Sequence, residues 1–356
     1  MTTKIHSRAP TRIDLAGGTV DIWPIYLFLK NPTTINLGID LYAETTLEDH
    51  SDGLVVLRSG DQGAELKFSW SEMDGITPPA SLELHYKFLR HFLALKKKAG
   101  TFDAKNGLTF STTAKSPAGA GLGGSSTLSI SMIGALATWA LGKFDTALEG
   151  EKMIELARDV ETTVIQVPAG LQDYYGAMFG GLQSLQWRAG AHARKWLNPD
   201  ILDGLEKRLL LFYSGQSRNS GINNWALFKS FIDKQGPVRD QFSSIATATE
   251  KLEAALIEQD WNSVGAAIHE EWSVRKNLAP GISTADMNKA FDLAHEAGAT
   301  AGKICGAGGG GCFFVYVPST DSHVKAEIQA KITALGIRSL PFHASKSGLE
   351  VTVHRG

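Results

Sequence analysis

The chain has 356 residues, 43% of them apolar and 20% charged, a composition typical of a folded protein with two ordinary-sized domains. Its 35 basic and 37 acidic side chains leave a net charge of −2, which excludes strong general attraction to nucleic acid or to an anionic membrane and favours small-molecule partners. The sequence has only two cysteines, no signal-peptide core in "MTTKIHSRAP" and no apolar run of the roughly 18 residues that span a bilayer, so we expect a cytoplasmic protein.

The first half of the chain begins with a series of strands. Residues 4–68 alternate or run apolar between Gly, Asp and Ser breaks, and a helix is expected over 81–100. A strand over 106–115 leads into a glycine-rich loop and its helix, and a further helix over 150–165 precedes a strand over 181–187. Several strands, a helix, a strand and a helix in this order indicate an α+β domain more than strict βαβ winding.

The second half is expected to start with a strand over 207–215. Four helices should follow, at 222–235, 238–257, 259–277 and 284–297, and then a strand at 312–318, a helix at 323–335 and a strand at 348–354. The sequence therefore predicts two domains, residues 1–190 and residues 191–356.

The glycine-rich loop "SPAGAGLGGSST", residues 116–127, does not fit the two best-known phosphate motifs. Gly119-x-Gly121-x-x-Gly124 matches the dinucleotide-binding spacing, but the acid at the right distance, Asp145, follows one continuous helix and no second strand. The sequence therefore argues against an NAD oxidoreductase. No Gly-Lys-Ser/Thr follows either, which excludes a P-loop.

The same loop still has the properties of an anion site. Glycines let the backbone approach a ligand, and amides at a helix start can point at an anion. The ordinary alternative is a turn with capping serines, but a cap needs only one hydroxyl. We therefore predict that the loop holds phosphate, that Ser125, Ser126 and Thr127 lie in the first helical turn, and that a side chain at Gly121 would block phosphate with little effect on stability.

A second glycine run, "KICGAGGGGC" at residues 303–312, lies directly before an apolar strand. It could be a surface linker, but "CFFVYV" and Ile304 flank it tightly, so we expect it to line the active site. Cys305 and Cys312 are expected to be small buried side chains, because no nearby base would activate a thiolate.

Four charged residues are candidates for chemistry. Arg12 lies on an expected strand in "APTRIDLAGGTVDIWP", where Asp21 follows a glycine turn. Glu161 lies near the end of a helix, and Asp173 follows a Pro-Ala-Gly turn in "VPAGLQDYYGAMFGG". Each could be an ordinary solvated side chain, but a phosphoryl-transfer enzyme needs a cation, a hard metal ligand and a carboxylate near the attacking hydroxyl.

Taken together and in this order, these stretches resemble the GHMP kinases, over nearly the whole chain. The resemblance implies a two-domain α+β fold, with an N-terminal half like ribosomal protein S5 domain 2, a ferredoxin-like C-terminal half, and ATP and substrate between them. The phrases "LLLFYSGQSRNSG", "LQDYYGAMFGG" and "HEEWSVRKNLAPGIS" resemble the heptose 7-phosphate kinase and L-fucokinase branch, and "LAGG" stands where galactokinases carry Gly-Glu-His.

The resemblance also assigns roles to residues of this chain. Ser125 and Glu161 would hold Mg²⁺, Asp173 would contact the attacking hydroxyl, and Arg12 would take the place of the catalytic Lys or Arg. ATP would be held by Pro117, Gly119, Ala120, Gly121, Leu122, Gly123, Gly124, Ser125 and Ser126. The substrate would contact Gly17, Gly18, Thr19, Asp21, Arg218, Gly308 and Gly309.

The expected activity is ATP- and Mg²⁺-dependent phosphorylation of a sugar or sugar-phosphate hydroxyl, the anomeric one by resemblance, by a monomer or homodimer. The chain departs from the family pattern at two places. Heptose kinases carry Gly-Gly-Gly-Thr-Asp where this chain has "GGTVD" at 17–21, which leaves the identity of the sugar undecided. Its "GGS" at 123–125 replaces the family's usual Gly-Ser-Ser. A cluster of Arg218 with Ser217 and Ser220 would suit an anionic substrate group. The alternatives are a mevalonate-type or galactokinase-type kinase and an inactive nucleotide-binding regulator of the same fold.

Overall fold

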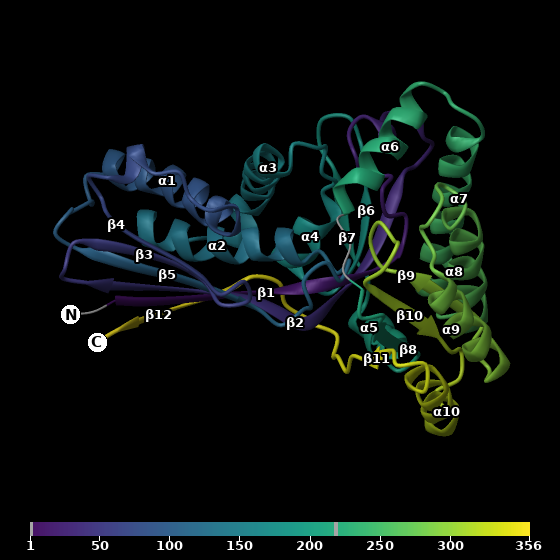
Figure 1. The fold of residues 1–356 in the computed structure, drawn as a ribbon. Helices are drawn as coiled ribbons and strands as arrows, with labels where there is room; N and C mark the ends of the chain where they lie inside the picture. Colours follow the sequence, from purple (N-terminus) through teal and green to yellow (C-terminus); the bar gives the residue numbers. More distant parts are fainter. Residues whose placement is uncertain (1–2, 217–219) are drawn as a thin grey trace.

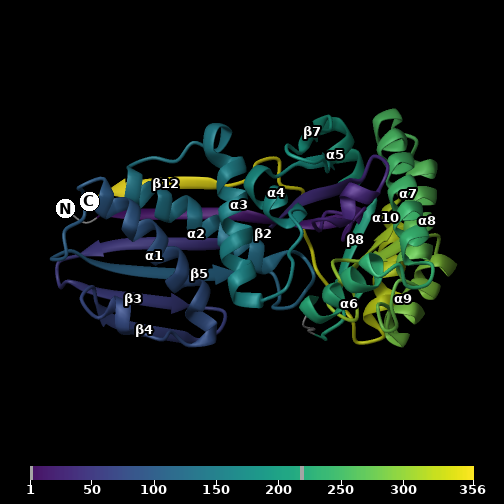
Figure 2. The same ribbon diagram turned by 90° about the horizontal axis from the view of Figure 1, so that it is seen from above.

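The computed structural model describes residues 3–216 and 220–356, without the side chains of residues 220–224. Two sheets, each flanked by helices, form the two ends of an elongated molecule (Figure 1). Both ends of the described chain lie on the larger sheet, where the last strand pairs with the first (Figures 1 and 2).

The larger sheet has the strand order β12-β1-β2-β5-β3-β4, with β6 paired to β2 and β7 paired to β6. Its strands are β1 (Thr3–Ala16), β2 (Thr33–His50), β3 (Leu54–Ser59), β4 (Ala64–Ser69), β5 (Gly107–Ala114), β6 (Leu182–Gln186), β7 (Ala193–Trp196) and β12 (Glu350–Arg355). Its helices, which cover one face of the sheet in Figure 1, are α1 (Glu83–Lys98), α2 (Gly124–Leu141), α3 (Thr146–Ile165) and α4 (Gln172–Phe179).

The smaller sheet has the order β11-β8-β10-β9. Its strands are β8 (Leu209–Tyr213), β9 (Ala301–Ile304), β10 (Cys312–Tyr316) and β11 (Arg338–Ser339). The helices of this half are α5 (Pro199–Glu206), α6 (Ser220–Ile232), α7 (Val238–Glu258), α8 (Trp261–Arg275), α9 (Ala285–Glu296) and α10 (Ser322–Thr333). The described residues also include three short 3₁₀ helices: η1 (Ile25–Phe28), η2 (Met73–Gly75) and η3 (Ala80–Leu82).

Strand β1 carries the first charged residues of the site into the core. Its last eight residues are all buried, and its pairing with β2 shifts register between Ala9 and Thr11 and again between Asp14 and Ala16. Pro10 lies at the first shift, where a residue without an N–H is tolerated because the ladder is interrupted. The regular stretch between the two shifts holds Arg12 and Asp14 on the same face of the strand.

Helix α2 is a core helix that places the glycine loop against this strand. Its apolar residues are spread all round the helix, and 14 of its 18 residues are buried. Gly123 and Gly142, both in the left-handed region, flank its two ends. No single helix in the described part of the chain is long and apolar enough to cross a membrane; α2 and α3 meet the criteria of length and composition only as a pair, bent by 116°.

The expected two-domain α+β architecture is confirmed, but the chain does not divide cleanly at residue 190. The prediction assigned residues 191–356 to one second domain, whereas β7 and β12 belong to the larger sheet. The return to that sheet is made through Ser345, whose N–H donates to the Gly38 carbonyl at 2.8 Å and whose carbonyl accepts from Gly181 N–H at 2.7 Å.

Candidate active site

The side chain of Arg12 connects the predicted catalytic aspartate to the glycine loop. Its Nε donates to Asp173 Oδ1 at 2.8 Å, its Nη2 reaches the same oxygen at 2.5 Å, and its Nη1 donates to the Gly121 carbonyl at 2.7 Å. Burial acts to lower the pKa of Arg12, but the carboxylates of Asp173 and Asp14 raise it overall. The Asp173 side chain is 26% exposed, against 3% for Arg12, so the aspartate keeps an open side.

Asp173, which follows the Pro-Ala-Gly turn, lies in the first turn of α4. Helix α4 is only eight residues long, and its N-cap residue, Leu171, gives no side-chain cap. A Cβ placed on Gly123, which caps α2, would lie 3.1 Å from Cβ and Cγ of Asp173. The start of α2 therefore faces the aspartate, and an anion held by that helix end would lie beside it.

The second glycine run packs directly on the first. The N–H of Cys312 donates to the Ala120 carbonyl at 2.7 Å, and a Cβ on Gly311 would lie 2.7 Å from the same oxygen. A Cβ on Gly121, where φ is +75°, would lie 2.4 Å from the Cys305 carbonyl oxygen. Because a side chain at Gly121 would strain both the backbone and this contact, the expectation that it would leave stability intact is wrong.

The remaining residues predicted to hold ATP or substrate lie around these two runs. The Pro117 carbonyl accepts from Ala120 N–H at 3.1 Å, and the Leu122 carbonyl accepts from Arg12 N–H at 3.2 Å. Gly119 and Ser125 are exposed, whereas Ser126 is buried. Gly309 N–H donates to the Ile282 carbonyl at 2.6 Å, and Gly308 packs on the same residue.

The predicted metal ligands also lie together. Glu161, on α3, is buried and accepts a hydrogen bond at Oε2 from Tyr174 Oη at 2.6 Å. Burial raises the pKa of Glu161, while hydrogen bonds from Tyr174, Ser125 and Ser126 oppose that rise. The described residues contain no group of three His, Cys, Asp or Glu that could hold a metal. One carboxylate and a hydroxyl, completed by phosphate oxygens, nevertheless suit Mg²⁺.

Asp21 forms a second buried carboxyl next to Asp173. Its Oδ2 accepts from Gln172 N–H, at the start of α4, at 3.0 Å, and a Cβ on Gly170 would lie 2.1 Å from the same oxygen. Burial raises the pKa of Asp21 to about 6, with the Gln172 hydrogen bond opposing the rise and the charge of Asp173 adding to it. The predicted sugar-binding aspartate and the predicted catalytic aspartate are thus neighbours.

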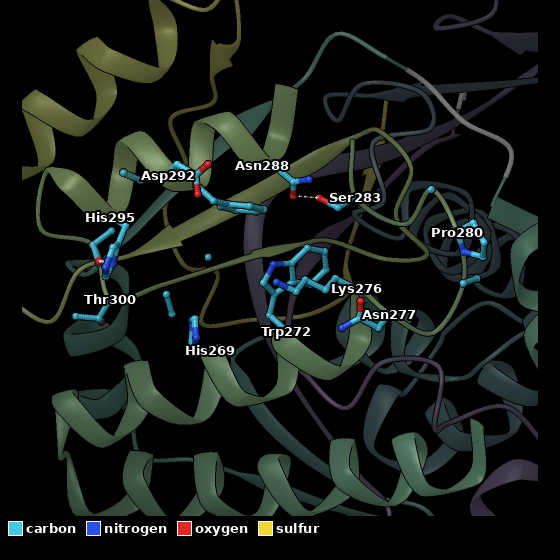
Figure 3. Close-up of a pocket in the computed structure, with 17 residues that line it drawn as sticks. His269, Trp272, Lys276, Asn277, Pro280, Ser283, Asn288, Asp292, His295 and Thr300 are labelled. Atoms are coloured by element: carbon cyan, nitrogen blue, oxygen red, sulfur yellow. Dashed lines mark hydrogen bonds between the residues drawn. The ribbon is translucent and has the colours of Figure 1, made fainter. Parts of the chain in front are cut away.

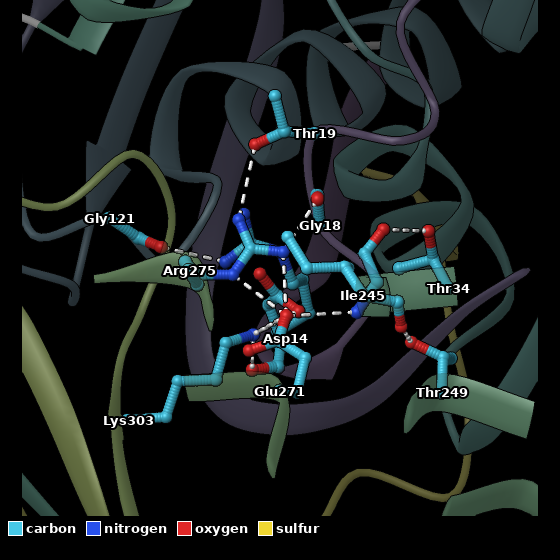
Figure 4. A network of polar contacts seen from close by, with 12 residues as sticks. Asp14, Gly18, Thr19, Thr34, Gly121, Ile245, Thr249, Glu271, Arg275 and Lys303 are labelled. Carbon is cyan, nitrogen blue, oxygen red and sulfur yellow. Dashed lines mark hydrogen bonds and ion pairs between the residues drawn. The ribbon is translucent and has the colours of Figure 1, made fainter. Parts of the chain in front are cut away.

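The predicted substrate turn Gly17–Thr19 is buried and is held by charged residues that sequence reasoning missed. Figure 4 shows Asp14, Glu271, Arg275 and Lys303 in contact beside Gly18 and Thr19. Glu271 and Arg275 lie in "HEEWSVRKNLAPGIS", a phrase that contributed only to the resemblance, although the two residues have the i,i+4 spacing of a helical ion pair. The other signal was Lys303, a charged residue within β9, a short strand whose residues are all buried.

One predicted substrate residue, Arg218, lies outside the described residues, as do Ser217 and the side chain of Ser220. The proposed anion-binding cluster at these positions therefore stays a prediction.

A cavity of about 710 Å³ lies between α8 and α9 and is not lined by Glu271 or Arg275 (Figure 3). His269 and Trp272 line it from α8, Lys276 lines it from the position directly after α8, and Asn288 and Asp292 line it from α9. It shares no residue with the predicted site.

Two family models match this chain. The model of the GHMP kinases N-terminal domain matches residues 84–181, and the model of the GHMP kinases C-terminal domain matches residues 252–335. The chain belongs to the GHMP kinases. It is accordingly an ATP-dependent phosphotransferase that acts on an alcohol group.

Relatives of this GHMP kinase differ in their named acceptors. It is 27% identical to the D-glycero-alpha-D-manno-heptose 7-phosphate kinase of Campylobacter jejuni, over 90% of this chain and 91% of that protein. It is also 27% identical to the L-fucokinase/L-fucose-1-P guanylyltransferase of Bacteroides fragilis, over 92% of this chain but 36% of that longer protein. The solved mevalonate kinase of Methanococcus jannaschii superposes with a TM-score of 0.73 at 17% identity, covering 96% of this chain and 98% of that one. The fold alone therefore does not decide the acceptor.

Gly124 offers a cleaner test of the phosphate site than Gly121. Its φ is not positive, and a Cβ there would meet only Ser116 Oγ, at 3.2 Å. We predict that Gly124→Ala raises KM for ATP several-fold with little change in Tm, because the methyl group hinders phosphate approach, whereas Gly121→Ala lowers Tm. Steady-state kinetics and thermal unfolding measure both, and an unchanged KM for ATP in Gly124→Ala would remove this helix end from the nucleotide site.

Asp21 should give acceptor binding a pH dependence. In the folded protein its pKa of about 6 lies above the usual value of 3.8. The contribution of Asp21 to stability therefore falls as pH rises from 3.8 to about 6, and it is constant at higher pH. If the carboxylate accepts hydrogen bonds from acceptor hydroxyls, kcat/KM for an unphosphorylated sugar at saturating ATP should rise through about pH 6. Asp21→Asn should abolish that titration, and a profile identical to wild type would exclude Asp21 from acceptor binding.

Proposed function

We propose that this GHMP kinase transfers the γ-phosphoryl group of ATP to a hydroxyl of a sugar or sugar phosphate. The observation that carries the proposal is the placement of Asp21 beside the Arg12–Asp173 pair. One carboxylate serves the reacting hydroxyl, and the second accepts from neighbouring hydroxyls, which a polyol supplies. An acceptor with its own carboxylate, such as mevalonate, would meet the negative charge of Asp21.

Asp173 and Arg12 have complementary roles in the proposed reaction. Arg12 binds only Oδ1 of Asp173, which leaves Oδ2 for the acceptor O–H. Because a loose phosphoryl-transfer transition state needs little base assistance, Asp173 chiefly orients the hydroxyl. Arg12 stays charged and lies between Asp173 and Gly121, where it favours the negative charge that develops on the transferring group.

A magnesium ion fits the group formed by Ser125 and Glu161. When bound, it would neutralise charge on the nucleotide phosphates. Tyr174 fixes the orientation of the Glu161 carboxylate through its 2.6 Å hydrogen bond, and burial excludes water from that side. The retention of Arg12, Ser125, Glu161 and Asp173 in one arrangement argues against an inactive nucleotide-binding regulator.

The anomeric hydroxyl is the proposed acceptor position because the relatives named for heptose 7-phosphate and L-fucose share 27% identity with most of this chain. Within this proposal, Arg218 would bind a phosphate already present on the sugar, as its paired N–H donors suit a phosphate group.

Glu161→Gln tests the proposed metal site. We predict a large loss of turnover and a higher Mg²⁺ concentration for half-maximal activity, since one charged oxygen ligand is lost. Glu155→Gln, an exposed change on the same helix, is the matched control and should leave the Mg²⁺ dependence unchanged. If both variants titrate with Mg²⁺ as wild type does, Glu161 is not a ligand.

A panel of acceptors tests the proposed function itself. ADP release with ATP and Mg²⁺ should be fastest with heptose 7-phosphate, fucose, galactose or an N-acetylhexosamine, and slow with mevalonate. Phosphorus NMR of the product should show the new phosphate coupled to the proton on C1. A phosphate on a primary hydroxyl would contradict the anomeric proposal, and a preference for mevalonate over every sugar would contradict the sugar proposal.

A further inference from the structure

Four charged side chains form a buried network between the two halves of the molecule. Asp14 lies on β1 of the larger sheet, Lys303 on β9 of the smaller sheet, and Glu271 and Arg275 on α8. Lys303 Nζ lies 2.8 Å from Asp14 Oδ1 and 3.5 Å from Glu271 Oε1, and Arg275 Nε donates to Glu271 Oε1 at 2.7 Å. All four side chains are at most 3% exposed.

This network holds the backbone of the glycine turn from one side. Arg275 Nη2 donates to the Gly18 carbonyl at 2.7 Å, and Nη1 donates to Thr19 Oγ1 at 3.3 Å. Glu271 Oε1 accepts from Gly17 N–H at 3.2 Å. Two helix residues therefore bind three consecutive positions of the turn.

The turn's own residues are suited to this contact. A Cβ on Gly18 would lie 2.2 Å from Asp14 Oδ2, so only glycine leaves room for that carboxylate. Gly17 and Thr19 both have positive φ, of +77° and +68°, and a Cβ on Gly17 would lie 2.0 Å from the Thr33 carbonyl oxygen. For Thr19 this is a strained conformation that its surroundings must maintain.

Stability alone does not explain a buried group of four charges. Buried ion pairs contribute little compared with apolar side chains of similar volume, although loss of a single partner is strongly destabilising. The network also lies close to the reacting groups, since the charge of Asp14 acts on Arg12 and the charge of Asp21 acts on Arg275. Its contacts fix the conformation of the Gly17–Thr19 turn at the edge of the predicted site.

We propose that Glu271 and Arg275 are positioning residues that hold Gly17–Thr19 in the conformation that binds the acceptor, and that they set acceptor affinity without changing ATP affinity. This inference rests on the proposed function, because it takes the turn to be part of the acceptor site. The ATP loop is held by other contacts, chiefly those of Ala120 and Gly121 with residues 305–312.

A charge-balanced double variant, Glu271→Leu with Arg275→Met, tests the inference while the Asp14–Lys303 pair remains. We expect KM for the acceptor to rise by about tenfold or more, with KM for ATP changed by no more than about twofold. Arg275→Lys keeps the charge but cannot reach all three partners, so it should give an intermediate acceptor KM. Lys276→Met removes the neighbouring, exposed cation on the cavity face and should behave as wild type.

Hydrogen exchange in the absence of substrates separates this inference from the proposed function. Amides of a peptide covering residues 15–22 should exchange about tenfold faster or more in the double variant, and residues 116–127 should exchange as in wild type. Unchanged exchange at 15–22, or an ATP KM that rises as much as the acceptor KM, would overturn the inference. If the double variant does not fold, Arg275→Lys decides by the same two measurements. A wild-type enzyme inactive on every sugar would contradict the proposed function only.

Discussion

The arrangement of the site depends on one guanidinium group. Arg12 binds Asp173, the proposed catalytic aspartate on α4, and the carbonyl of Gly121 in the predicted ATP loop, so two segments more than 50 residues apart in the chain are held by one side chain. Burial disfavours the charged form of Arg12, but the carboxylates of Asp173 and Asp14 raise its pKa overall, so it remains a cation. The bulged strand β1 makes this possible, since it places Arg12 in the core between the sheet and the helices.

The glycines explain how the two halves of the molecule come together around this cation. The runs at 116–127 and 303–312 contact each other through backbone atoms, as in the 2.7 Å hydrogen bond from Cys312 to Ala120. Side chains at Gly121 or Gly311 would separate the runs. Glycine is therefore required here for the close contact of the two domains, and in the proposed ATP site it would also give phosphate access to the amides at the start of α2.

Much of the fold could be predicted from the sequence because its signals are local. Helical spacing predicted α1 and α3, and the two glycine runs marked the beginning of α2 and of β10. Helix α4 was missed because "LQDYYGAMFGG" is short and rich in glycine, and the return of β12 to β1 has no local signal. The Asp14–Lys303 pair joins residues 289 positions apart, so no spacing rule could reveal it. The predicted site residues at Arg12, Ser125, Glu161 and Asp173 came from the resemblance and from motif order.

In the proposed reaction, the Arg12–Asp173 pair acts on the transferring group and not on ground-state binding. Asp173→Asn tests it most directly, because the change keeps the size of the side chain and its hydrogen-bonding capacity but removes the charge. Kinetics with ATP and the preferred acceptor should show kcat lower by roughly 10²-fold or more, with both KM values changed only modestly. A near-wild-type kcat, or a loss confined to KM, would contradict this account of the site.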